Sequence, residues 1–110
     1  MWYLEKEVLI SASHYLKGYE GKCSNLHGHN WRVVVYCKGS KLDEVGMLVD
    51  FVRVSEAVKS FDHRDLNSVL PSDENPTAEN LAKRIYELVP FCWQVMVEET
   101  PGSRVYYREE

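Results

Sequence analysis

The alternation of apolar and polar residues is most regular between residues 29 and 38. Every second residue in the middle of this segment is apolar: Trp31, Val33, Val35 and Cys37. Successive side chains of a strand point to opposite faces of a sheet, so these four would share one face and the segment is predicted to be a strand. Residues 2–12 carry three charged positions among β-forming residues and then become apolar, which predicts an edge-like strand.

Two later segments have the spacing of amphipathic helices. In the first, apolar residues recur three or four positions apart and predict a helix of about ten residues: Val54, Ala57, Val58 and Phe61. The second begins at Asn75, Pro76 and Thr77, because Pro suits the first helical turn and a side-chain oxygen accepts a free backbone N–H. Its apolar stripe ends before Pro90 and comprises Leu81, Ile85 and Leu88.

Alternation returns at residues 93–99, and Pro101-Gly102-Ser103 predicts a turn into a last strand at residues 104–108. The predicted order is strand, strand, helix, helix, strand, strand, which is an α+β fold with an antiparallel hairpin at each end. The chain has 110 residues without repeats or low-complexity segments, so residues 1–110 are expected to form one domain. A core of this size is small, and association of subunits would stabilise it.

Composition and charge exclude some classes of partner. Thirteen basic and seventeen acidic residues give a net charge of −4, so the overall field does not favour nucleic acid or an anionic membrane, and an anionic ligand would need a local basic pocket. No apolar run approaches the ~18 residues of a membrane span, and the start lacks the pattern of a signal peptide. The three widely spaced cysteines fit a reducing compartment. We therefore expect a cytoplasmic protein.

Three of the four histidines, His14, His27 and His29, fall within sixteen residues. His27 and His29 are two apart where the most regular strand begins, so both rings would project from one face, and His14 follows the preceding strand. Three neutral imidazoles with one open position are the arrangement of a catalytic zinc site. The spacing also allows two surface histidines on a turn, or a closed structural zinc site in which Cys23 is the fourth ligand.

If Cys23 is not a ligand, it is a free thiol close to the metal. A divalent cation and Lys22 would favour its thiolate form, which can take a proton or attack a substrate. Its polar neighbours distinguish it from Cys37 and Cys92, which are expected to be buried packing residues.

The fourth histidine, His63, follows Asp62 directly. A carboxylate that orients an imidazole is typical of general acid/base catalysis. Asp65 is a competing partner, and an exposed loop histidine without a catalytic role is the alternative.

Glu99 has the parity of the apolar positions in segment 93–99, so its carboxylate would point to the apolar face and need a partner. A ligand with two parallel N–H donors would fit its two oxygens. An internal ion pair with Lys or Arg fits the same pattern.

These residues fall in six blocks that are spread along the chain from residue 11 to residue 100: SASH at 11–14, KCSNLHGHN at 22–30, GMLVDF at 46–51, DHRDLN at 62–67, NPTAEN at 75–80 and ET at 99–100. In this order the blocks resemble the 6-pyruvoyl-tetrahydropterin synthase family. Within the family they are most similar to the 6-carboxy-5,6,7,8-tetrahydropterin synthases of the queuosine pathway.

The resemblance implies the tunnelling fold (T-fold), with a four-stranded antiparallel sheet and two helices on one face. It implies a homo-oligomer, a trimer or a hexamer made of two trimers, with active sites between subunits. It also implies a role for each motif residue. His14, His27 and His29 would bind Zn²⁺, and the catalytic residues would be Cys23, Asp62, His63 and Glu99. The substrate-binding residues would be Glu99, which anchors the pterin, Thr77 and Thr100.

The implied substrate is 7,8-dihydroneopterin triphosphate. In the queuosine branch, triphosphate and acetaldehyde leave and 6-carboxy-5,6,7,8-tetrahydropterin remains, and the three residues between Cys23 and His27 favour this branch. The alternatives are the pyruvoyl product, aldolase-like cleavage of dihydroneopterin and a non-enzymatic binding module stapled by zinc. Charge and position alone suggest Lys17, Lys22 and Arg64 as groups that meet the triphosphate.

Overall fold

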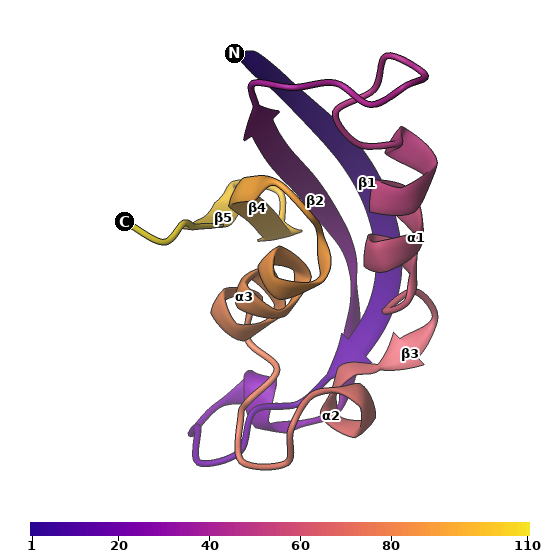
Figure 1. The fold of residues 1–110 in the computed structure, drawn as a ribbon. Coiled ribbons are helices and arrows are strands. Elements are labelled where there is room, and N and C mark those ends of the chain that lie inside the picture. The colour runs from indigo at the N-terminus through magenta and orange to yellow at the C-terminus, as the bar shows by residue number, and fades with distance from the viewer.

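Two long strands form the centre of the computed structural model, which describes residues 1–110 (Figure 1). β1 (Trp2–His14) and β2 (His27–Gly39) pair antiparallel over their whole length. Figure 1 shows them as a long curved hairpin that runs the height of the molecule. The pairing confirms the first predicted hairpin and extends both strands as far as the histidines.

Three further strands complete the sheet. β4 (Cys92–Thr100) pairs antiparallel with β2, and β5 (Ser103–Tyr107) pairs antiparallel with β4. The short β3 (Arg64–Asp65) pairs parallel with the end of β1. The strand order is therefore β3-β1-β2-β4-β5.

Helices cover one face of the sheet. α1 (Phe51–Lys59) packs on β1, and α3 (Ala78–Leu88) packs on β4 and β5. Their inward residues join one hydrophobic core with the facing residues of β1, β2 and β4, so both helices lie on the same face. None of the helices is long and apolar enough to cross a membrane. The predicted α+β architecture, with two main helices on one side, is confirmed.

The element count differs from the prediction. The structure has five strands instead of four, and it adds the single-turn η1 (Lys22–Ser24) and the short α2 (Leu66–Val69). β3 and α2 have only two and four residues, which is too short to show a periodic pattern. They arise inside the DHRDLN block, where the Asp65 carboxylate accepts the N–H of Asn67 and begins α2.

The cap and the buried face of α3 follow largely from its sequence. Thr77 caps its first turn by accepting the N–H of Asn80, as the sequence predicted. Leu81 and Ile85 are fully buried, but Leu88, the third member of the predicted stripe, is 49% exposed. Leu88 is the last residue of the helix, and it lines a surface cavity with Phe61 and Leu70.

Replacing Ile85 with Ala is expected to lower the free energy of unfolding by about 2–5 kcal/mol, because the change leaves a cavity in the core. Leu88→Ala in the same helix is the matched control and should change it by less than about 1 kcal/mol. Chemical denaturation followed by circular dichroism measures both. Equal losses for the two variants would contradict the assignment of the buried face.

Candidate active site

Three histidines converge where β1 ends and β2 begins. His14 lies directly opposite His27, and His29 lies opposite Ala12. Directly paired residues share a face of the sheet, so all three rings project from the same side. The ring centroids are 4.5 to 5.0 Å apart, and one ligand atom of each ring lies within 4.8 Å of the others. The register of β1 and β2 therefore assembles the predicted three-histidine group.

Backbone carbonyls fix two of the rings. His14 Nδ1 lies 2.7 Å from the carbonyl oxygen of Pro76, and His27 Nδ1 lies 2.6 Å from that of Asn25. A carbonyl oxygen only accepts hydrogen bonds, so each Nδ1 carries the proton and each Nε2 keeps a lone pair. Metal-bound histidines have this arrangement.

His14 Nε2 and His29 Nε2 are buried without a hydrogen-bond partner. Such atoms are rare, because each has lost its hydration without compensation. Burial lowers the pKa of His29, and His14 and His27 act in the same direction against the effect of Glu99. The neutral form is the one that binds metal. The donor set therefore fits a zinc ion with three nitrogen ligands and one open position.

Two asparagines hold the chain segment that follows His14. Asn67 accepts the N–H of Tyr15 at 2.9 Å and donates to its carbonyl at 3.1 Å. Asn75 bonds to Lys17 in the same way, with both distances at 2.8 Å. Each side-chain amide thus accepts the N–H of one residue and donates to the carbonyl of the same residue, as the backbone of a neighbouring strand does. Sequence reasoning missed this function, although both residues lie in the DHRDLN and NPTAEN blocks.

Glu99 lies on the predicted face, beside the histidines. Its carboxylate oxygens are 3.8 Å from His14 Nε2 and 3.7 Å from His29 Nε2, and the side chain is 30% exposed. The nitrogen atoms closest to its carboxylate therefore belong to histidines, and the alternative prediction of an internal ion pair with Lys or Arg is wrong. The carboxylate can accept from a ligand that enters the open position beside the rings.

Thr77 and Glu99 line one cavity of about 390 Å³, together with residues at the start of α3 and of β5. The Thr77 hydroxyl oxygen accepts the N–H of Asn80, but its proton is free to bond to a ligand. Thr100 is exposed at the end of β4 and does not line this cavity. The structure thus brings together two of the three predicted substrate-binding residues.

Asp62 contacts His63, as the sequence predicted. Its Oδ2 lies 3.0 Å from His63 Nδ1, while Oδ1 accepts the N–H of Ser11 at 2.7 Å. The Ser11 N–H is the main reason that the pKa of Asp62 is lowered, and His63 adds to it. His63 has a φ of 57°, and its own N–H donates to the Ser11 carbonyl. The competing partner, Asp65, instead begins α2.

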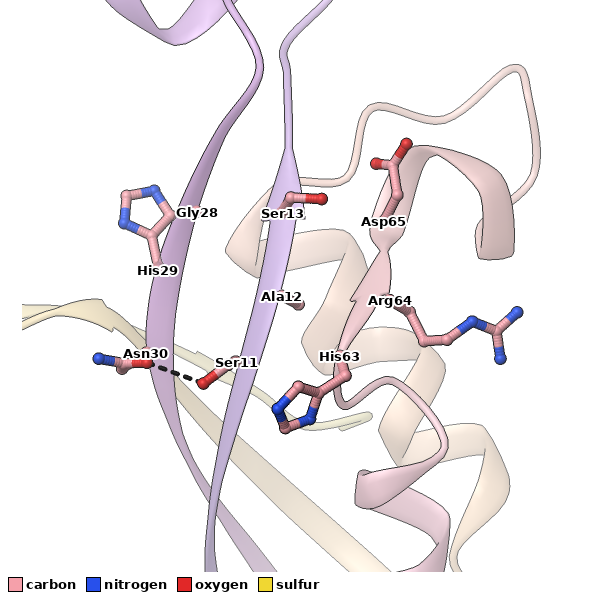
Figure 2. Close-up of a pocket in the computed structure, with 9 residues that line it drawn as sticks. All are labelled: Ser11, Ala12, Ser13, Gly28, His29, Asn30, His63, Arg64 and Asp65. Carbon is pink, nitrogen blue, oxygen red and sulfur yellow. Dashed lines mark hydrogen bonds between the residues drawn. The ribbon is translucent and has the colours of Figure 1, made fainter.

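His63 points into a second cavity of about 480 Å³ between β1, β2 and β3. In Figure 2 its ring lies beside Ser11, whose hydroxyl donates to Asn30. Arg64 lines the same cavity. The side chain of His63 is 82% exposed, so its Nε2 side is open to a ligand or to another chain.

The other residues that the sequence predicted for the site are Cys23, Lys17 and Lys22, and none of them belongs to the three-histidine group. Cys23 is a partly exposed free thiol on η1 and is not among the ligand atoms that cluster within 4.8 Å. The geometry therefore favours an open site with three ligands over a closed site with Cys23 as the fourth. Lys17 uses its ammonium group to donate to the Ser72 carbonyl. Lys22 lies on η1, next to Cys23.

Comparison with known proteins adds independent evidence. The family described as "6-pyruvoyl tetrahydropterin synthase" matches residues 3–110. The chain is 36% identical to the 6-carboxy-5,6,7,8-tetrahydropterin synthase of Bacillus subtilis (strain 168), over 96% of this chain and 84% of the relative. It is 37% identical to the protein of the same name from Synechocystis sp., over 97% and 93%.

A solved structure has the same fold. The 6-pyruvoyl tetrahydropterin synthase of Caenorhabditis elegans superposes with a TM-score of 0.77 at 24% identity and covers 99% of this chain and 96% of its own. The structural neighbours have the T-fold, which confirms the predicted fold class. The chain belongs to the 6-pyruvoyl tetrahydropterin synthase family.

Proposed function

We propose that this protein is a zinc-dependent lyase that converts 7,8-dihydroneopterin triphosphate into 6-carboxy-5,6,7,8-tetrahydropterin, with release of acetaldehyde and triphosphate, in queuosine biosynthesis. The observation that carries the proposal is the three-histidine group, with two buried nitrogens that lack any partner. The fit of these nitrogens to zinc supports a metal site, and membership of a pterin synthase family supports the substrate class.

The carboxy product is favoured over the pyruvoyl product by two observations. Two relatives at 36% and 37% identity are named for the carboxy reaction. The interval of three residues between Cys23 and His27 also favours that branch. The 6-pyruvoyl reaction remains the second candidate, because the family description carries that name.

Each residue of the site would have a separate role in the proposed reaction. Bound zinc would supply a Lewis acid that polarises the hydroxyl groups of the substrate side chain. Glu99 would accept two N–H groups of the pterin ring, by the geometry that pairs a carboxylate with two parallel donors. Cys23, as a thiolate, would remove a proton from the side chain. His63 would move protons on the other side, with Asp62 holding its Nδ1 proton.

The arrangement of these groups supports a site shared between subunits. His63 lies in a cavity separate from the one that Glu99 and Thr77 line. β1 has an open edge from its start to Ser11, because β3 covers only Ala12 and Ser13, and β5 is open on its outer side. Open edges can pair with another copy of the chain. We therefore propose a trimer or a hexamer in which His63 of one subunit serves the zinc site of its neighbour.

The product test separates the candidate reactions. Purified protein with zinc is incubated with 7,8-dihydroneopterin triphosphate and, in parallel, with dihydroneopterin, and the products are identified by mass. The expected product is 6-carboxy-5,6,7,8-tetrahydropterin with acetaldehyde, from the triphosphate alone. A pyruvoyl product would support the second candidate, and turnover of dihydroneopterin alone would support aldolase-like cleavage.

Removal of zinc is expected to abolish turnover and to leave the fold intact. Twenty buried apolar residues form one core between the sheet and the helices, and we expect this core to maintain the fold without the ion. Far-ultraviolet circular dichroism before and after chelation measures the fold, and turnover after addition of zinc measures recovery. Unfolding on chelation would instead indicate a binding module stapled by zinc.

Glu99→Gln is expected to weaken pterin binding by about 10- to 100-fold, because one oxygen acceptor and the negative charge are lost. Zinc content, measured by atomic emission, should not change. Glu56→Gln is the matched control, since Glu56 is exposed on α1 and lines neither the cavity of Glu99 nor that of His63. Loss of zinc with unchanged pterin affinity would show that Glu99 is a metal ligand and not the pterin anchor.

A further inference from the structure

Two cysteines that the proposed mechanism does not use lie opposite each other on neighbouring strands. Cys37 on β2 and Cys92 on β4 are register partners. The register shifts between this pair and the next one, Tyr36 with Gln94, so Trp93 is an extra residue in β4. Such a bulge changes which face the following side chains occupy.

The bulge determines where the Cys92 thiol points. In a regular strand, Cys92 would share a face with Gln94, which pairs with Tyr36 on the face away from Cys37. The Trp93 ring instead lies 5.9 Å from the ring of Tyr36, and Cys92 packs against the hydrophobic core to which Cys37 belongs. The extra residue thus turns Cys92 to the side of Cys37.

Backbone spacing permits a bond between the two thiols. Directly opposed residues of antiparallel strands have Cα atoms about 4.5–5.5 Å apart. Disulfides span Cα distances of about 4.4–6.8 Å. Register partners such as Cys37 and Cys92 therefore fall in the range of backbone spacing that a disulfide can span.

The two thiols differ in exposure and acidity. Cys37 is fully buried, whereas Cys92 is partly exposed and lines a cavity of about 510 Å³ with Lys38 and Arg108. Each sulfur lies near a backbone carbonyl oxygen, Cys37 Sγ at 3.6 Å from that of Pro90 and Cys92 Sγ at 3.4 Å from that of Gln94. The neighbouring Cys37 thiol is the main reason that the pKa of Cys92 is lowered, and the pKa of Cys37 is raised by Cys92 and by burial. The exposed thiol is thus the one that ionises first. Oxidation-sensitive cysteines are typically accessible and acidic, with a second thiol beside them.

We propose that Cys37 and Cys92 form an oxidisable thiol pair, in which a peroxide oxidises Cys92 and Cys37 then closes a disulfide. The Cys92 thiolate attacks one oxygen of hydrogen peroxide, the O–O bond breaks, and sulfenic acid and hydroxide form. The Cys37 sulfur then attacks the Cys92 sulfur, and the S–O bond breaks. Its thiol proton leaves with the departing hydroxyl group as water, so two thiols and one peroxide give one disulfide and two waters.

The disulfide would act on the fold and not on the metal site. The pair lies where β2 ends and β4 begins, and Lys38 donates its N–H to the Phe91 carbonyl there. His27, His29 and Glu99 lie at the opposite ends of the same strands. Oxidation is expected to raise the unfolding temperature by several degrees, because it joins distant parts of the chain in the unfolded state. Zinc content should be unchanged.

The test must separate this pair from Cys23, the third thiol. The folded full-length chain with Cys23→Ala is treated with hydrogen peroxide, and its intact mass and its peptides are measured without reduction. The expected result is a loss of two hydrogen atoms, a peptide that joins Cys37 to Cys92, and reversal by a thiol reductant. In the Cys37→Ala background, dimedone should label Cys92 as its sulfenic acid, whereas Cys92→Ala should leave Cys37 unlabelled.

Two outcomes would overturn the proposal. One is an unchanged mass in the Cys23→Ala chain under conditions that label Cys92 in unfolded protein. The other is labelling of Cys37 before Cys92. Because Cys37→Ala alters a buried position, circular dichroism checks its fold, and peptide mapping of the oxidised chain with both cysteines present gives an answer even if that variant does not fold.

Discussion

The antiparallel register of β1 and β2 is the constraint on which the rest of the structure depends. It places His14 opposite His27 and, four residues away on each strand, Ile10 opposite Trp31. The same face thus carries the metal-ligand candidates at one end and the hydrophobic core along its length. A slip of one residue would move every side chain of one strand to the other face. The core and the histidine group therefore specify the same register, and neither can form without it.

The histidine rings must be held in fixed positions, and contacts with neighbouring residues do this. The indole N–H of Trp31 donates to the Ala12 carbonyl, and its ring packs edge-on against His14 and His29. Behind His14, the Pro76 carbonyl fixes one ring nitrogen, and the amides of Asn67 and Asn75 hold the chain that follows. Buried nitrogens without a partner persist only in such a rigid setting. Rigidity of this kind is what a metal site requires of the groups around its ligands.

Sequence patterns predicted the strands and helices in which apolar residues recur at a regular spacing. Alternation in β2 and the spacing in α3 gave the hairpin, the helix and the face that each buries. The parity of Glu99 placed its carboxylate correctly, because a strand has a fixed period of two. Sequence patterns did not predict the features that depend on only a few residues. β3 and α2 are too short to be periodic, and the bulge at Trp93 moves Cys92 to the other face of β4. Leu88, the last residue of α3, is exposed although it continues the apolar spacing. Cys37 is buried as predicted, whereas Cys92, also predicted to be buried, is partly exposed.

The positions of paired and unpaired arginines limit where an anionic ligand could bind. Arg32 is paired with Glu7 at 2.6 Å and with Glu98 at 3.2 Å, and Arg104 shares Glu98. These arginines lie across β2 and β5, and acidic partners already neutralise them. Arg64 has no acidic partner and lines the cavity of His63 from β3, the edge strand of the sheet. In a chain with a net charge of −4, an unpaired arginine beside a solvent-exposed histidine is a local basic site, and it lies at the edge where a second subunit can approach.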